Sequence, residues 1–136
     1  MYPEALVKPM KGELVSAGFQ DLNTPESVEK AIAEKGTVLM VVNSVCGCAA
    51  GAARPGVKKS LEHSKKPLHL STVFAGFDID AVAQARKHFS PYPPSSPCIA
   101  LFKDGESVHM LERHHIEGRN AEMISQHLKM VYDEFC

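Results

Sequence analysis

The stretch VLMVVNSVCGC, residues 38–48, decides the fold. Its first five residues are all apolar and mostly β-branched, which predicts a strand that is buried on both faces and therefore central in a sheet. Its last three residues are Cys46-Gly47-Cys48, and helix-compatible sequence follows them. The sequence therefore predicts two cysteines at the point where a central strand ends and a helix begins. In open α/β sheets this carboxyl end of the strands is where ligand sites lie.

The chain on either side of this stretch predicts an α/β fold. Residues 4–17 are compatible with a helix that Pro9 and Gly12 interrupt. Further helices are predicted over residues 24–35, 48–64 (kinked at Pro55), 79–88 (capped by Asp78) and 120–135, and further strands over residues 68–74, 99–102 and 108–111. This order implies a parallel β-α-β crossover followed by an antiparallel hairpin and a last helix. We expect a mixed four-stranded sheet with helices on both faces and an extra N-terminal helical segment.

Length and composition place the chain among single-domain globular proteins. Its 136 residues are 44% hydrophobic and 23% charged, and they contain no repeat, so we interpret residues 1–136 as one domain. The net charge is −1, which argues against nucleic-acid or anionic-membrane partners. No apolar stretch approaches the length of a membrane span. The first ten residues include Glu4, Lys8 and two prolines and do not resemble a signal peptide, so the expected address is the cytoplasm.

The spacing of the cysteine pair predicts redox chemistry. A thiol beside a helix N-terminus is stabilised as the thiolate, which is its reactive form. A disulfide across Cys46-Gly47-Cys48 closes a ring one residue smaller than the common Cys-x-x-Cys ring, so we expect it to be strained and easily reduced. Gly47 supplies the backbone freedom that so small a ring needs. The pair therefore indicates a thiol exchanger or isomerase that is poised toward oxidation.

Two other interpretations of the pair stay open. Free cysteines are often small, buried, apolar residues. Alternatively, Cys46 and Cys48 supply two ligands of a metal site that Cys98 and a histidine complete, although no second closely spaced ligand pair is present and the histidines lack a metal-ligand spacing. The sequence therefore predicts no metal site, and stoichiometric zinc or iron held by the cysteine pair would contradict thiol exchange.

Residues 95–106, SSPCIALFKDGE, resemble the stretch of thioredoxins that runs from their cis-proline through the next strand and its turn. The resemblance implies a thioredoxin-like fold in which the Ser96–Pro97 bond is cis. It also implies that this loop lies against the redox cysteines and that the backbone of Ser96 pairs with the substrate chain. Ser96 and Pro97 are therefore candidate substrate-binding residues.

Residues 42–51, VNSVCGCAAG, followed by Ala53-Arg54-Pro55, resemble the signature of the bacilliredoxins, a bacterial group with Cys-Gly-Cys in place of Cys-x-x-Cys. The resemblance covers nearly the whole chain. It implies an enzyme that removes bacillithiol, a low-molecular-weight thiol and here the expected co-substrate, from mixed disulfides on protein clients. Cys46 is then the attacking thiol, Cys48 is the candidate resolving thiol, and their disulfide is the only redox group. A monothiol route, in which free bacillithiol resolves Cys46, stays open. The alternatives are a general protein disulfide isomerase and a non-enzymatic module that binds a metal or an iron–sulfur cluster.

A few further residues are candidates for auxiliary roles. Met40 stands where thioredoxins keep a buried acid, so we expect an apolar environment under the pair. Cys98 directly follows the proposed cis-proline and is either a third redox thiol or a core residue. Arg54 either attracts a carboxylate of bacillithiol or stabilises its helix. His114 either assists proton transfer or belongs to a salt-bridged loop, and Cys136 is an incidental terminal thiol.

Overall fold

Strand β2 (Thr37–Asn43) lies at the centre of the sheet, and all seven of its residues are buried. A computed structural model describes the whole chain, residues 1–136. β2 pairs in parallel with β3 (His69–Phe74) and in antiparallel with β4 (Cys98–Lys103), and β4 continues into the antiparallel strand β5 (Glu106–Leu111). The predicted parallel crossover and antiparallel hairpin are both confirmed.

The sheet has five strands in the order β1-β3-β2-β4-β5, so the prediction of four strands was one strand short. The additional strand β1 (Gln20–Asp21) pairs in parallel with β3 at the edge of the sheet. Two residues are too few to show the alternation of apolar and polar side chains by which a strand is recognised. Only its pairing with β3 identifies β1.

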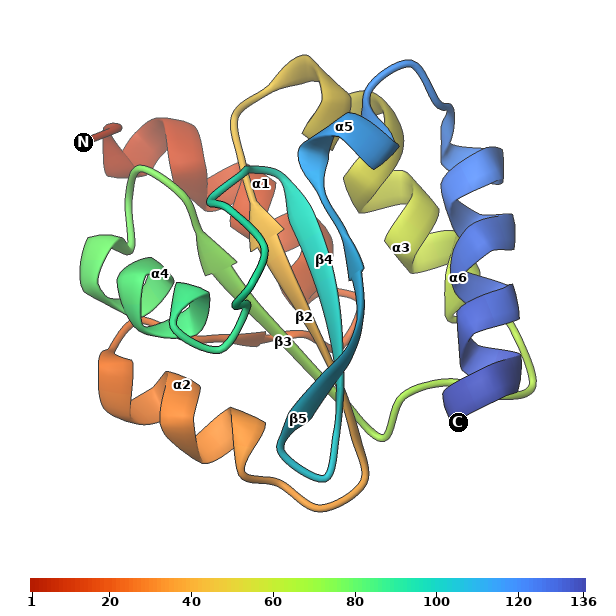
Figure 1. The fold of residues 1–136 in the computed structure, drawn as a ribbon. Coiled ribbons are helices and arrows are strands. Elements are labelled where there is room, and N and C mark those ends of the chain that lie inside the picture. Colours follow the sequence, from red (N-terminus) through yellow and green to blue (C-terminus); the bar gives the residue numbers. More distant parts are fainter.

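Helices cover both faces of the sheet (Figure 1). α2 (Pro25–Ile32) and α4 (Ile79–Arg86) pack on one face, and α3 (Arg54–Ser60) and α6 (Ala121–Phe135) pack on the other. Side chains of a strand alternate between the two faces, so Met40 and Val42 enter the α2–α4 cluster while Leu39 and Val41 enter the α3–α6 cluster. We call these the first and second apolar clusters, and they contain 16 and 15 buried residues.

Several element boundaries follow the chemistry that the sequence indicates. The Thr24 hydroxyl accepts a hydrogen bond from the Ser27 N–H at 3.1 Å and caps α2, whose first residue is Pro25. The hairpin turn between β4 and β5 uses Asp104 and Gly105, which have φ of 51° and 85°. These are the positive values that a tight two-residue hairpin turn requires.

The N-terminal helix α1 (Glu4–Val15) is continuous through Pro9. Lys11 anchors it to the rest of the fold, because its Nζ lies 3.1 Å from Asp21 and 2.9 Å from Asp78. Asp78 therefore does not cap α4 with its side chain as predicted. Its carboxylate accepts the Phe74 N–H at 3.1 Å and faces Lys11 instead.

The crossover after β2 begins as a π-helix, η1 (Ala49–Ala53), before α3 continues in α-helical geometry. The Arg54 N–H donates to the Ala49 carbonyl, five residues back. Pro55 has no N–H to donate, so the regular ladder is interrupted at this point. The predicted helix over residues 48–64 is therefore shorter, ending at Ser60, and it carries a wide first turn where a kink was expected.

A short helix, α5 (Arg113–Ile116), links β5 to α6 and was not predicted. It spans a single turn, which leaves no apolar periodicity in the sequence. No helix in the structure combines the length and the apolar character needed to cross a bilayer.

Candidate active site

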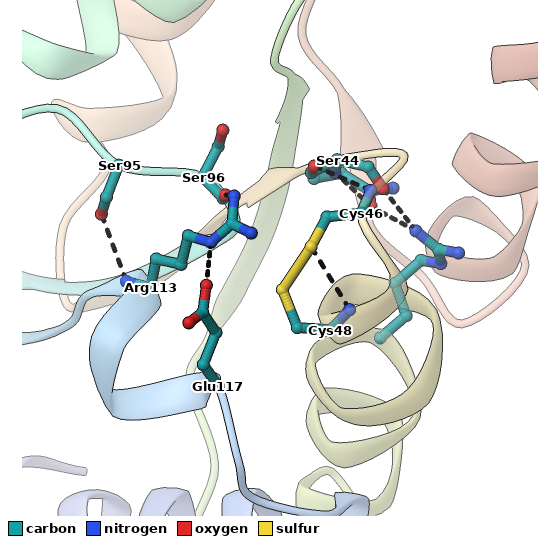
Figure 2. The surroundings of a disulfide bond; sticks show 9 residues. Ser44, Cys46, Cys48, Ser95, Ser96, Arg113 and Glu117 are labelled. Atoms are coloured by element: carbon teal, nitrogen blue, oxygen red, sulfur yellow. Dashed lines mark hydrogen bonds and ion pairs between the residues drawn. A yellow bond between two sulfur atoms is a disulfide. The ribbon is translucent and has the colours of Figure 1, made fainter.

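Cys46 and Cys48 lie between the end of β2 and the first turn of η1, and a disulfide joins them (Figure 2). Their Cα atoms are 5.4 Å apart. Both cysteines are half-buried, and Gly47 between them is exposed. The Cys46 carbonyl accepts hydrogen bonds from the N–H groups of Ala49 and Ala50, at 3.0 and 3.2 Å. The predicted junction of a central strand with a helix is therefore confirmed, and it presents a disulfide to solvent.

Backbone hydrogen bonds hold the loop that carries the pair. The Cys48 N–H donates to Cys46 Sγ at 3.3 Å. The Cys46 N–H donates to Ser44 Oγ at 3.1 Å, and the Ser44 N–H donates to Asn43 Oδ1 at 2.8 Å. A donor aimed at a sulfur atom favours its anionic form. The arrangement therefore supports a thiolate at Cys46 once the disulfide is reduced.

Arg54 is buried behind this loop, with 2% of its surface exposed. Its Nη1 donates to Asn43 Oδ1 at 2.9 Å and to the Ser44 carbonyl at 2.8 Å. Its Nε lies 3.2 Å from Glu13 Oε2, close enough for an ion pair, but the N–H is not aligned with a hydrogen-bond acceptor. The guanidinium thus binds the loop from inside, a position that favours a structural role over contact with a carboxylate arriving from solvent.

The N-terminal helix α1 also contributes to the support of the loop. Asn43 Nδ2 donates to the Met10 carbonyl at 3.2 Å, and Glu13 of α1 supplies the carboxylate that faces Arg54. The extra N-terminal helical segment is therefore joined to the cysteine loop through Asn43 and Arg54. The sequence showed the segment but gave no sign of this connection, because Met10 lies 33 positions from Asn43 and Glu13 lies 41 positions from Arg54.

The Ser96–Pro97 bond is cis, as predicted, and the Ser90–Pro91 bond is cis as well. Cys98 pairs with Val42 in the sheet, so the proline loop lies next to the end of β2. Figure 2 shows the Ser95–Ser96 loop and α5 on one side of the disulfide. From the sequence, only the resemblance to thioredoxins predicted that this loop lies near the cysteines. The pairing of Cys98 with Val42 is the physical reason for that proximity.

Arg113 in α5 binds the proline loop, a contact that the sequence did not indicate. Its N–H donates to Ser95 Oγ at 3.2 Å and its Nη1 donates to the Ser96 carbonyl at 3.3 Å. Its Nε forms an ion pair with Glu117, one turn later. Arg113 is exposed, so it places a cation at the surface beside the disulfide (Figure 2).

Cys98 lies in the first apolar cluster, whereas Cys48 packs against the second cluster on the opposite face of the sheet. Cys98 is 3% exposed, and burial raises the pKa of its thiol to about 12. A neutral, enclosed thiol is a poor nucleophile. The position favours the core role for Cys98. Met40, which stands where thioredoxins keep a buried acid, is fully buried in the same cluster, so its surroundings are apolar.

His114 points away from the fold, with 69% of its side chain exposed, and its Nε2 lies 3.8 Å from Glu112. Its contacts are therefore those of the salt-bridged loop. Cys136 is an exposed free thiol at the C-terminus. Neither residue is brought to the cysteine pair by a hydrogen bond or an ion pair.

Comparison with known proteins matches the chain to one family over almost its whole length. The family model described as disulphide isomerase matches residues 2–136. A bacilliredoxin of Cytophaga hutchinsonii is 68% identical over 134 residues, covering 98% of this chain and 99% of that protein. A bacilliredoxin of Halalkalibacterium halodurans is 50% identical over 136 residues, covering 99% of this chain and 94% of that protein.

Solved structures with the same fold include thioredoxins. Mitochondrial thioredoxin 3 of Saccharomyces cerevisiae, in its oxidised form, superposes with a TM-score of 0.61 at 12% identity, covering 90% of this chain and 98% of that one. A thioredoxin of Malassezia sympodialis superposes with a TM-score of 0.61 at 13% identity, covering 87% of this chain and 90% of that one. At these identities the likeness concerns the fold, and it confirms the predicted thioredoxin-like class.

Proposed function

This chain belongs to the bacilliredoxin family of thioredoxin-like thiol–disulfide oxidoreductases, and on that premise we propose that it removes bacillithiol from mixed disulfides on protein cysteines. The observation that carries the proposal is the half-buried Cys46–Cys48 disulfide at the end of the central strand. We further propose that the enzyme works in the cytoplasm, on protein clients that carry this low-molecular-weight thiol.

In the first step, the Cys46 thiolate of the reduced enzyme attacks the bacillithiol sulfur of the client's mixed disulfide. The bond between bacillithiol and the client breaks, and the client cysteine leaves as a thiolate that takes a proton from solvent. A bacillithiol–Cys46 disulfide has then formed. The hydrogen bond from the Cys48 N–H to Cys46 Sγ supports this assignment, because a backbone donor stabilises the negative charge of the attacking sulfur.

In the second step, the Cys48 thiolate attacks Cys46 Sγ, and bacillithiol leaves as a thiolate that is then protonated. The two enzyme thiols have together supplied two electrons, and the enzyme is left with the Cys46–Cys48 disulfide. The Cα separation of 5.4 Å supports this step because it lies within the usual range for disulfides. A thiol reductant must then restore the dithiol before another turnover.

The proline loop is the proposed docking site of the client chain. The resemblance to thioredoxins implies that the backbone of the residue before the cis-proline pairs with the substrate chain. In this sequence that residue is Ser96. The Ser96 carbonyl already accepts a hydrogen bond from Arg113, whose side chain is exposed. We infer that an arriving backbone N–H replaces this long hydrogen bond, while the ion pair to Glu117 keeps the arginine beside the site.

The family description favours disulfide isomerase activity as a second candidate function. The same Cys46 thiolate would attack a non-native protein disulfide and leave again after the client has rearranged, with no net oxidation. The two functions differ in the need for Cys48. An isomerase cycle closes when the client's own thiol displaces Cys46, whereas release of bacillithiol by the dithiol route consumes the Cys48 thiol.

The decisive experiment follows a client that carries one bacillithiol as a mixed disulfide, incubated with one equivalent of reduced enzyme and analysed by mass spectrometry. We expect the native sequence to release bacillithiol, Cys46→Ala to abolish release, and Cys48→Ala to accumulate bacillithiol on Cys46. Cys136→Ser is the matched control and should behave as the native sequence, because that thiol lies at the exposed terminus. Full activity of Cys46→Ala would overturn the proposed mechanism.

A parallel assay on a scrambled multi-disulfide protein measures isomerase activity separately. If Cys48→Ala restores the native disulfides as well as the native sequence does, Cys46 alone supports isomerisation. A protein that rearranges disulfides and leaves the bacillithiol mixed disulfide intact would exclude the proposed substrate while retaining the oxidoreductase class.

A further inference from the structure

Two histidines that the redox chemistry does not use face each other between β5 and α6. His109 Nε2 lies 2.9 Å from His127 Nε2, and the ring centroids are 5.1 Å apart. Both side chains are half-buried, and His109 lies on β5 while His127 lies on α6. Two neutral imidazoles at this distance share one N–H···N hydrogen bond, in which one ring donates and the other accepts. The two Nε2 atoms are therefore held close together.

The pair opens into a cavity of about 240 Å³ at the surface. The lining combines two imidazoles and one carboxylate with apolar side chains, contributed by His109, His127, Met130, Val131 and Glu134. Glu134 stands about two turns after His127 in α6, so both lie on the same face of that helix. Two imidazole nitrogens with a carboxylate form a donor set of the kind that zinc ions take in proteins.

The spacing of the rings fits one metal ion between them. Two imidazoles that bind a tetrahedral zinc ion through nitrogen atoms 2.0–2.1 Å away have ring centres about 5 Å apart. The observed centroid separation of 5.1 Å already has this value. Binding therefore requires a tilt of the two rings, so that both Nε2 lone pairs point at the ion, and a rotation of the Glu134 side chain, because its carboxylate does not lie within 4.8 Å of both Nε2 atoms.

We propose that His109 Nε2, His127 Nε2 and the Glu134 carboxylate form a surface site for Zn²⁺, with water at the fourth position. The nearby charged and titratable groups are Glu134, which favours a cation, and His115 and Arg119, which oppose one when charged. The site lies apart from Cys46 and Cys48 and does not depend on the proposed redox function. Its expected effect is to bridge β5 and α6 and to stabilise the folded chain.

A neighbouring group of side chains is the competing location for the ion. The donor atoms of Glu112, His114 and His115 lie within 4.8 Å of one another. However, His114 is largely exposed on a single-turn helix, and none of these three residues lines a cavity, whereas His109 and His127 do. We therefore assign the ion to the His109–His127 pair, and the test separates the two locations.

The test titrates ZnCl₂ into the full-length oxidised Cys136→Ser protein at pH 7.5 by isothermal titration calorimetry, with thermal unfolding in parallel. In this form Cys46 and Cys48 are tied in their disulfide and Cys98 is buried, so no accessible thiolate competes for the metal. We expect one equivalent of zinc to bind and the unfolding temperature to rise. His109→Gln and His127→Gln should each lower the affinity at least tenfold, and Glu134→Gln should lower it by a smaller factor.

His69→Gln is the matched control, because that histidine lies on β3 and should leave zinc binding unchanged. Circular dichroism of each variant establishes that it is folded before titration. The proposal is overturned if the native pair binds no zinc, or if His109→Gln and His127→Gln retain full affinity. It is equally overturned if His114→Gln with His115→Gln abolishes binding while the pair is intact.

Discussion

Arg54 is the residue whose role depends most on its surroundings. From the sequence, a single arginine in a helix is interpreted as a surface residue or as one that binds an anion. In the structure Arg54 is enclosed, and its Nη1 donates to both Asn43 Oδ1 and the Ser44 carbonyl. The Ser44 hydroxyl in turn accepts the Cys46 N–H. Arg54 therefore acts as a positioning residue for the cysteine loop and carries a buried positive charge behind it.

We predict that Arg54→Met lowers the free energy of unfolding by about 1–3 kcal/mol, because the Ser44 carbonyl loses its buried hydrogen-bond donor. We also expect alkylation of the reduced Cys46 thiol to slow, since the buried positive charge behind the cysteine loop is gone. Urea denaturation measures the first effect, and the pH profile of Cys46 alkylation measures the second.

Arg119→Met is the control for this substitution, because Arg119 is exposed and should change neither quantity. Arg54→Lys keeps the charge while losing the planar fork, so it should retain more of the native Cys46 alkylation rate than Arg54→Met. An unchanged alkylation profile in Arg54→Met would contradict the positioning role, even if the protein became less stable.

The reactivity of Cys98 shows whether a third thiol takes part in the chemistry. Burial raises the pKa of Cys98 to about 12. An ordinary thiol ionises near pH 8.5, so Cys98 in the folded protein is still the neutral thiol at that pH. We predict that iodoacetamide leaves Cys98 unmodified in the folded protein at pH 8 and modifies it readily after unfolding in guanidinium, as read by mass spectrometry. Rapid modification in the folded state would instead place Cys98 within reach of solvent and of the cysteine pair.

At the scale of elements, the contact of α3 with α6 depends on Gly56. A Cβ atom built at Gly56 would lie 2.7 Å from Ile124 Cβ and 3.0 Å from the Ala121 carbonyl oxygen. Both distances are too short for an unstrained contact, and one of the two neighbours is backbone. The close approach of the two helices therefore requires glycine at this position, although its backbone needs no left-handed conformation.

Gly56→Ala should lower the free energy of unfolding by about 1–3 kcal/mol, because α3 and α6 must separate to admit the methyl group. Gly12→Ala in α1 is the matched control, since nothing lies within 4 Å of a Cβ there. That change should stabilise the protein by up to about 1 kcal/mol through helix propensity. Denaturant titration compares the two variants, and equal stabilities would contradict the proposed packing.

Elements differ in how far they were predictable. β2 was recognised because an unbroken apolar run of strand length has few other uses, and α6 because Ile124, Leu128 and Val131 recur at helical spacing. β1 and α5 were not predicted because elements of two and four residues are too short to show a periodic pattern of apolar side chains. The π-helical turn η1 was also missed, since Pro55 indicates an interruption of the ladder but not its form.

At the scale of the whole molecule, the fold rests on its two apolar clusters, one on each face of the sheet. The Cys46–Cys48 disulfide joins residues only two positions apart. A loop that small restricts the unfolded chain little compared with a long-range disulfide. The cysteines are therefore available for chemistry because the structure does not need them for its stability.

The sequence by itself determined the α/β class, the buried central strand, the cysteine pair at its end and the hairpin after the proline loop, because each depends on residues close together in the chain. Only the tertiary structure decided that Arg54 is enclosed, that Cys98 and Cys48 belong to opposite faces, that α1 supports the cysteine loop and that His109 meets His127. These relations join residues that are distant in sequence, and the packing of elements around the sheet sets them.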